Sequence, residues 1–164
     1  MRRLWPVGIL LLQACGQPDF SLRGYTNLSD CRTVIDTELA NGAEFVSAFD
    51  TDVSGPQEGA VTQLSTSLLE TPVAIYVDCA GNGKVRSIDY IANQQDLAAS
   101  SRFFDGVAGQ IGELFGTATA TESPTMRSRT YFCDDRGMIS LRQAKHDEQD
   151  FEVSLLVVPV PSRC

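Results

Sequence analysis

Two short acidic stretches have residue types that could bind a cation or move a proton. The first, residues 50–55 (Asp-Thr-Asp-Val-Ser-Gly), matches the first six positions of a calcium-binding loop, in which alternate oxygens and a glycine turn surround one ion. The twelfth position of such a loop supplies a bidentate Glu, and here it is Val61, although Glu58 could contribute from the ninth position. We therefore interpret this stretch as a solvated acidic turn and predict no metal site.

The second stretch, residues 145–150, contains the only histidine of the chain, His146. A histidine beside carboxylates can act as a general base, but no nucleophile in a recognisable context accompanies it. The sequence also lacks the closely spaced Cys and His ligands of a zinc site, a nucleophile elbow and a Walker phosphate loop. We therefore predict a structural loop around His146, a protein that is not an enzyme, and no cofactor.

The N-terminal segment has the three parts of a secretory signal peptide: Arg2 and Arg3, an apolar run from Leu4 to Leu12, and the small residue Ala14. The run is too short to cross a bilayer as a helix, which needs about 20 apolar residues. The tetrapeptide Leu12-Gln13-Ala14-Cys15 resembles the lipobox of bacterial lipoproteins, which has Leu three residues before the lipidated cysteine and a small residue directly before it.

The resemblance implies that residues 1–14 are removed and that Cys15 receives a diacylglycerol and, on its new amine, a fatty acid such as palmitate. Several acyl chains give lasting membrane attachment, whereas one chain gives only marginal binding. By the same resemblance, Gly16 rather than Asp after the cysteine fits delivery to the outer membrane, facing the periplasm. The alternative is an ordinary secreted protein, cut near Ala14, that keeps Cys15 as a free thiol.

Lipidation of Cys15 would leave four of the five cysteines, namely Cys31, Cys79, Cys133 and Cys164. An even number in an oxidising compartment indicates two disulfides. Three pairings are open, and we prefer Cys31 with Cys79 and Cys133 with Cys164. Each of these bridges joins neighbouring stretches, and the second would hold a C-terminus that otherwise frays.

The charge of the chain limits its partners. The formal net charge is −8, and removal of residues 1–14, which contain two arginines and no acid, brings it to −10. Because phosphate backbones are bound mainly by clustered Lys and Arg, we predict no nucleic-acid partner. Anionic lipid headgroups would also be repelled, so the acyl chains must hold the protein at the membrane.

The hydrophobic pattern predicts a helix followed by strands in the first half of the chain. Asn27 is the expected helix cap, and Asn41-Gly42 the expected stop. Asn82-Gly83 predicts a hairpin turn. The four expected strands are 45–50, 61–69, 73–79 and 85–91.

The second half repeats this order. A helix is expected over 96–115 with a stop at Gly116. Its Gly106, Gly109 and Gly112 permit close backbone approach or mark a weak, kinked helix, and both alternatives remain open. We expect a loop over 117–127 and strands over 129–133, 138–143 and 151–158.

These elements predict an α+β fold, an antiparallel sheet with two helices packed on one face. Tyr76-Val77-Asp78-Cys79 and Tyr131-Phe132-Cys133-Asp134 echo each other, which suggests two degenerate helix-plus-strands repeats. In layout, the chain resembles small envelope-assembly lipoproteins and beta-lactamase-inhibitor-protein-like domains. We expect a lipidated tether over 15–26 and a single domain over 27–164.

The anchor, the tether and the missing catalytic motifs together favour one interpretation of function. We predict a non-enzymatic binding or scaffolding lipoprotein of the cell envelope, acting through a protein partner. The alternative from another class is an inhibitor or small-ligand-binding periplasmic module.

Overall fold

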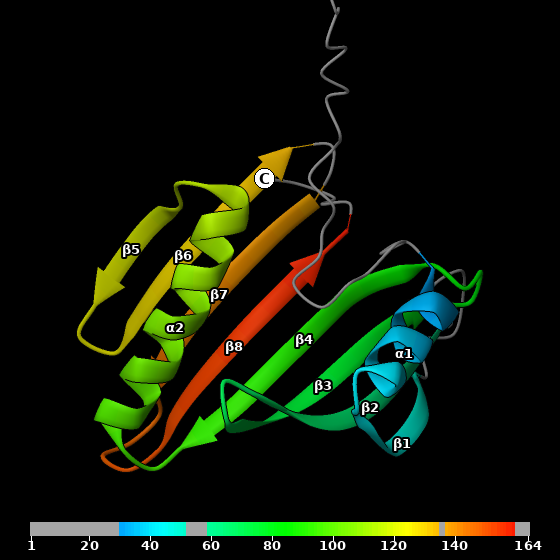
Figure 1. Cartoon of the computed structure of the whole chain (residues 1–164), viewed down its shortest axis with the longest axis horizontal. Helices are drawn as coiled ribbons and strands as arrows, with labels where there is room; N and C mark the ends of the chain where they lie inside the picture. Colours follow the sequence, from blue (N-terminus) through cyan, green and yellow to red (C-terminus); the bar gives the residue numbers. More distant parts are fainter. Residues whose placement is uncertain (1–29, 52–58, 135–136, 160–164) are drawn as a thin grey trace, which may run out of the picture.

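The protein is described by a computed structural model that covers residues 30–51, 59–134 and 137–159. The described residues form one eight-stranded antiparallel sheet with two helices on the same face (Figure 1). Buried side chains from both helices and from the central strands belong to one hydrophobic cluster. The predicted α+β fold class is confirmed.

The strand order is symmetric about the centre of the sheet. The first half of the chain forms α1 (Cys31–Ala40), β1 (Glu44–Thr51), β2 (Gly59–Leu68), β3 (Thr71–Ala80) and β4 (Val85–Gln94). The second half forms α2 (Leu97–Phe115), β5 (Thr119–Ser123), β6 (Met126–Asp134), β7 (Gly137–Lys145) and β8 (Phe151–Val158). The order β1-β2-β3-β4-β8-β7-β6-β5 places β4 against β8 in the middle, so each half supplies one helix and four strands in mirrored order.

The sequence echo that suggested the two repeats does not fall on equivalent strands. Residues 76–79 lie in β3, the third strand of the first half, whereas residues 131–134 lie in β6, the second strand of the second half. The two halves therefore repeat in the order of their helix and strands, and the prediction that the two similar tetrapeptides mark equivalent positions was wrong.

Strand register gathers large apolar side chains under the helices. One row across the helix-covered face, in which each residue pairs with the next, consists of Leu64, Ile75, Tyr90, Leu155 and Leu141, all buried. The expected inward face of the last strand is also confirmed, because Phe151, Val153, Leu155 and Val157 are all buried. These alternating positions are the period-two pattern of a sheet with one buried face.

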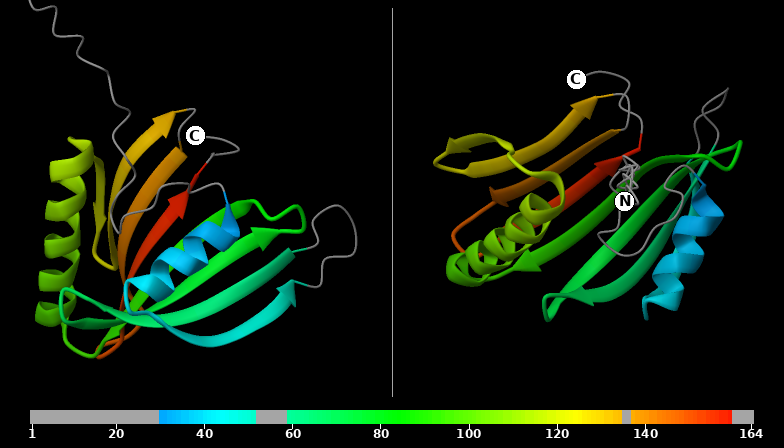
Figure 2. Two further views of the ribbon diagram at one scale, coloured as in Figure 1. Left: turned by 45° about the vertical axis from the view of Figure 1, so that its right-hand side comes forward. Right: turned by 45° about the horizontal axis from the view of Figure 1, so that its top comes forward.

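The two helices divide this face between them. α2 contacts β6, β7, β8 and β4, whereas α1 contacts β3. Figure 2 shows the same division from two further directions. Phe104, Val107 and Ile111 of α2 and Val34 of α1 are almost completely buried. Neither helix in the described residues is long and apolar enough to cross a membrane.

The start of the first helix differs from the prediction. α1 begins at Cys31, and its cap is Asp30, whose Oδ1 accepts a hydrogen bond of 2.8 Å from the backbone N–H of Thr33. The expected cap, Asn27, lies outside the described residues. Asp is as good a cap as Asn, so residue type alone could not choose between two candidates three positions apart. At the other end, Asn41 is the C-cap, as predicted.

The expected loop over 117–127 was wrong in its centre. Thr119–Ser123 forms β5, which pairs with residues 126–130 of β6. Every residue of β5 is exposed, so the strand has no apolar alternation to reveal it. The two threonines favour a strand through their branched side chains, and pairing with β6 settles the conformation.

The three glycines of α2, Gly106, Gly109 and Gly112, differ in their surroundings. A Cβ added at Gly106 would lie 2.8 Å from Cδ1 of Leu69, in the turn between β2 and β3. Added Cβ atoms at Gly109 and Gly112 would meet nothing within 4 Å. Close approach of a neighbouring element therefore explains Gly106 and leaves the other two without a packing reason.

Candidate functional site

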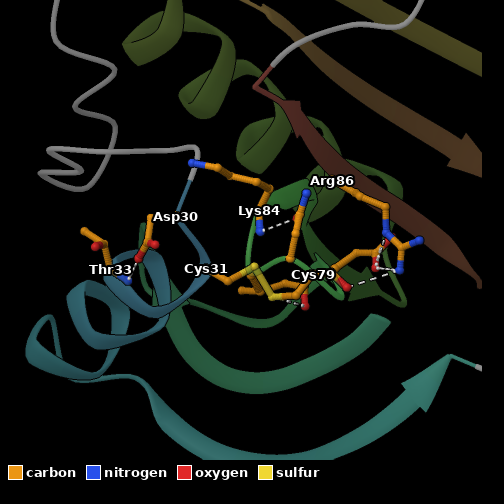
Figure 3. Close-up of a disulfide and its surroundings, with 9 residues drawn as sticks. Asp30, Cys31, Thr33, Cys79, Lys84 and Arg86 are labelled. Atoms are coloured by element: carbon orange, nitrogen blue, oxygen red, sulfur yellow. Dashed lines mark hydrogen bonds and ion pairs between the residues drawn. A yellow bond between two sulfur atoms is a disulfide. The ribbon is translucent and has the colours of Figure 1, made fainter. Parts of the chain in front are cut away.

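The N-terminus of α1 is fixed to the sheet by a disulfide. Cys31, the first residue of α1, is bonded to Cys79 near the end of β3, with 6.0 Å between their Cα atoms (Figure 3). This is the first pair that we preferred from sequence, and it is confirmed. The backbone N–H of Cys31 also donates a 3.0 Å hydrogen bond to the carbonyl of Gly83, and Asp30 forms a β-bridge with Lys84. The helix start is thus docked on the β3–β4 hairpin.

Charged groups surround this disulfide (Figure 3). The hydrogen bond from the backbone N–H of Thr33 lowers the pKa of Asp30, with smaller help from the Thr33 hydroxyl and the charge of Lys84. Arg86 forms an ion pair of 3.0 Å with Asp78 and donates a 3.2 Å hydrogen bond to the carbonyl of Cys79. These hydrogen bonds and the ion pair hold the helix start and the end of the hairpin together, which is a structural arrangement.

The other predicted cysteine sites lie outside what the structure describes. Cys15 and Cys164 are outside the described residues, as is Asn27. The backbone of Cys133 belongs to β6 and pairs with Met138, but its side chain is not described. Lipidation of Cys15 and a bridge between Cys133 and Cys164 therefore remain predictions.

The two acidic stretches fall in different places. Most of the calcium-like loop lies outside the described residues, and Asp50 is an exposed residue of β1. His146 lies in the turn between β7 and β8, where its backbone N–H donates a 2.9 Å hydrogen bond to the carbonyl of Asp150. Its side-chain Nε2 is 3.8 Å from a carboxylate oxygen of Glu152. Within the described ranges, no group of three or more His, Cys, Asp or Glu side chains could hold a metal ion.

The face of the sheet away from the helices has a polar row that crosses β1, β2 and β3. Ser47 donates 3.1 Å to the amide oxygen of Gln63, whose amide nitrogen donates 3.3 Å to the Tyr76 hydroxyl. In the strand register, Tyr76 of β3 lies opposite Asp89 of β4. The pKa of Asp89 is raised by burial and further by the negative charges of Asp78 and Glu152. Carboxylates of β3, β4 and β8 therefore lie near one another on this face.

A cleft lies beside the N-terminus of α2, between that helix and residues of β5, β6, β7 and β8. Its volume is about 350 Å³, and its lining includes Leu97, Met126, Phe151, Lys145 and Arg127. The Arg127 guanidinium stacks 4.0 Å from the centre of the Phe104 ring and pairs with Asp105 at 3.1 Å. It also donates hydrogen bonds to Gln143 and to the carbonyl of Ser101. Arg127 thus already links α2 to β6 and β7.

Among the strand residues whose side chains the structure describes, the large apolar ones with the greatest exposure lie on the β1 edge of the sheet. Phe45, Val46 and Phe49 are 60%, 51% and 49% exposed. They lie on one strand, and β2 is the single strand that pairs with β1 in the described part of the chain. Soluble proteins rarely leave apolar side chains clustered in this way unless the surface binds something. We call Phe45, Val46 and Phe49 the apolar edge.

Sequence reasoning predicted the strand over 45–50 but not this property. Phe45 and Val46 are consecutive, which breaks strict alternation, and the break is the one signal that was present. It coincides with a bulge between Phe45 and Ser47. That β1 is an edge strand follows from the strand order, which no local pattern encodes.

Comparison with known proteins adds no relative to this description. No protein-family model, curated protein or solved structure matches the chain.

Proposed function

We propose that this protein is a lipid-anchored, non-enzymatic binding module of the bacterial cell envelope. The lipobox-like Leu12-Gln13-Ala14-Cys15 supports the anchor, and Gly16 directly after the cysteine supports delivery to the outer membrane. The Cys31–Cys79 bridge is in keeping with an oxidising compartment, as the periplasm is. Arg86 pairs with Asp78 beside that bridge, and Arg127 pairs with Asp105, which fits a structural rather than a catalytic use of these two arginines.

The apolar edge is the observation that carries the binding function. Three large apolar side chains, each with about half or more of its surface exposed, cost free energy in water, and a partner that covered them would recover it. The lipid anchor would confine the protein to a membrane surface, which raises the effective concentration of any partner at that surface. The partner expected on this basis is another envelope protein.

The anchor is tested by labelling cells with an alkyne analogue of palmitate. Wild-type protein should take up the label and fractionate with membranes, whereas Cys15→Ala should lose both properties. Gly16→Ala is the matched control, since it keeps the acceptor sulfur and should keep the label. A wild-type protein without label would overturn the anchor and return Cys15 to the count of thiols.

The binding function is tested by photo-crosslinking in intact envelopes. A photoreactive residue at Phe49 should give a discrete adduct, and the same residue at Thr121, on the polar β5 edge, should not. The protein recovered from the adduct should then bind purified full-length protein. Failure to find such a partner at Phe49 would count against a binding role for this edge.

An inhibitor or small-ligand-binding module remains the second candidate, and the cleft beside α2 is what favours it. Its volume lies within the range of ligand sites, about 300–1,000 Å³. A screen of small carboxylates by NMR should shift the amide signals of Met126 and Phe151 if the cleft binds them. Lys145→Ala, which removes an exposed cation from the lining, should then weaken binding, and an unresponsive cleft would remove this candidate.

A further inference from the structure

We propose that the outer edge of β1 accepts an added β-strand from a partner protein, an extended segment with alternating apolar residues and a lysine or arginine at each end. This inference rests on the proposed binding function and specifies the chemistry of the partner. The placement of the apolar edge, the contrast between the two edges of the sheet, and the charges on β1 support it.

The apolar edge extends around both faces of the strand. Phe45 pairs with Leu64, a buried residue of the helix-covered face, and Phe49 pairs with Val61, on the opposite face. A helix or a membrane lying on one face would cover one phenylalanine and leave the other in water. A strand added beside β1 would cover both, because its own side chains alternate between the two faces.

The backbone of β1 suits such an addition. An edge strand presents unpaired N–H and C=O groups to a further strand. After the bulge at Val46, Ser47–Thr51 keeps a regular antiparallel register with β2, so five consecutive residues offer an undistorted edge. β1 is the outermost strand on its side of the sheet, and no described strand lies beyond it.

The opposite edge of the sheet shows how this protein protects an edge. β5 has five residues, Thr119–Ser123, all exposed, and the largest of them is Glu122. Short, polar strands with a charge are the usual protection against edge pairing. β1 has eight residues, and its exposed side chains include the large apolar ones of Phe45, Val46 and Phe49. The two edges therefore differ in chemistry, and within the described residues the β1 edge is the one that is suited to pairing.

Charge selects the kind of strand. Glu44 and Asp50 are exposed and lie on either side of the apolar residues. An opposite-charge pair across two strands is favourable, whereas like charges are unfavourable. A second copy of this chain would place a second acidic strand, with its own Glu44 and Asp50, beside the first. The net charge of −8 adds general repulsion between copies. A foreign segment with basic ends fits better.

The test uses full-length protein and two defined peptides. The probe has alternating Val and Thr with a Lys at each end, and its matched control has Glu in place of Lys. The Lys peptide should bind about ten times more tightly than the Glu peptide at low salt, and the preference should shrink as salt rises. Hydrogen exchange should show new protection of amides in β1 and none in β5.

Charge reversal makes the test specific. Glu44→Lys combined with Asp50→Lys should invert the peptide preference, since both residues are exposed and the fold does not depend on them. Thr119→Lys combined with Ser123→Lys, at the ends of β5, is the matched control and should leave the preference unchanged. Phe45→Ser combined with Phe49→Ser should weaken both peptides about equally.

Each contrary outcome overturns strand addition. These outcomes are equal binding of the two peptides, no binding of either, no inversion in the charge-reversed variant, or protection outside β1. A dimer that forms through β1 would replace the foreign strand with a second copy. If the envelope partner still crosslinks at Phe49 while the peptides fail, the binding function stands and the strand-addition mode is wrong.

Discussion

Tyr90 of β4 donates a hydrogen bond of 2.7 Å from its hydroxyl to the carboxylate of Glu38 in α1, and neither side chain has significant exposure to solvent. Residues 52 positions apart are joined by this bond, and it lies in the hydrophobic core rather than at its rim. A buried carboxylate is costly unless donors satisfy it. The bond therefore fixes the position of the last turns of α1 over the sheet.

Removing this donor should destabilise the fold. Tyr90→Phe leaves the buried carboxylate short of a hydrogen bond and should lower the free energy of unfolding by about 1–3 kcal/mol. Urea denaturation followed by circular dichroism measures the change. Tyr131→Phe is the matched control, because the Tyr131 hydroxyl donates 3.0 Å to a neutral carbonyl, that of Ala108, and its loss should cost less. Equal effects in the two variants would contradict a special role for Glu38.

The Cys31–Cys79 bridge should contribute strongly to stability. Its cysteines are 48 positions apart, and closing a loop of that length in the unfolded chain corresponds to about 4 kcal/mol. The double variant Cys31→Ala, Cys79→Ala should lose up to this amount in denaturant titrations, and reduced wild type, in which the predicted Cys133–Cys164 bridge is also broken, should lose at least as much. If oxidised wild type and the double variant unfold indistinguishably, the bridge does not stabilise the fold by lowering the conformational entropy of the unfolded chain.

The same oxidised protein tests the second predicted pair. Peptide mapping by mass spectrometry without reductant should recover Cys133 linked to Cys164, while Cys15 carries lipid. Recovery of Cys133 as a free thiol would contradict the pairing, and recovery of Cys133 linked to Cys15 would contradict both the pairing and the lipid assignment. The Cys31–Cys79 peptide provides an internal control in the same digest.

The sequence predicted the elements whose signal is local and missed the features set by strand order. The alternation of Val73, Ile75 and Val77 and the Asn82-Gly83 turn both act within a few residues, so the β3–β4 hairpin was predicted correctly. β5 was missed because its five exposed residues have no apolar face, and pairing with β6 forms the strand. The exposure of Phe45 and Phe49 depends on β1 being an edge, which is decided by contacts far along the chain.

Asp89 should make stability depend on pH in the direction opposite to most carboxyls. Its pKa is raised by burial first and then by the charges of Asp78 and Glu152, so the folded state keeps the proton to higher pH than the unfolded state does. Stability therefore falls as the pH rises from the ordinary value of 3.8 through the raised pKa. Asp89→Asn should be more stable than wild type at neutral pH, and the difference should vanish below that window.

Asp30 provides the comparison of opposite sign. The hydrogen bond from Thr33 lowers the pKa of Asp30, so its stabilising effect is present above 3.8 and is lost as the pH falls through the lowered pKa. Denaturation of Asp30→Asn and Asp89→Asn across this pH range should therefore give differences from wild type with opposite signs at neutral pH. Parallel profiles for the two variants would show that neither environment is as described.

The glycines of α2 should separate by their surroundings when each is changed to alanine. Gly109 and Gly112 face open space, so each substitution should stabilise the protein by roughly 0.5–1 kcal/mol through better helix propensity and a less flexible unfolded chain. At Gly106 the new methyl group would press against Cδ1 of Leu69, whose side chain must move. Gly106→Ala should therefore stabilise less than the other two, or destabilise. In the double variant Gly106→Ala, Leu69→Ala, the contact is gone, and the propensity gain at position 106 should reappear relative to Leu69→Ala alone. Thermal unfolding of the series measures this, and an equal gain at all three glycines would contradict the close approach of the β2–β3 turn to α2.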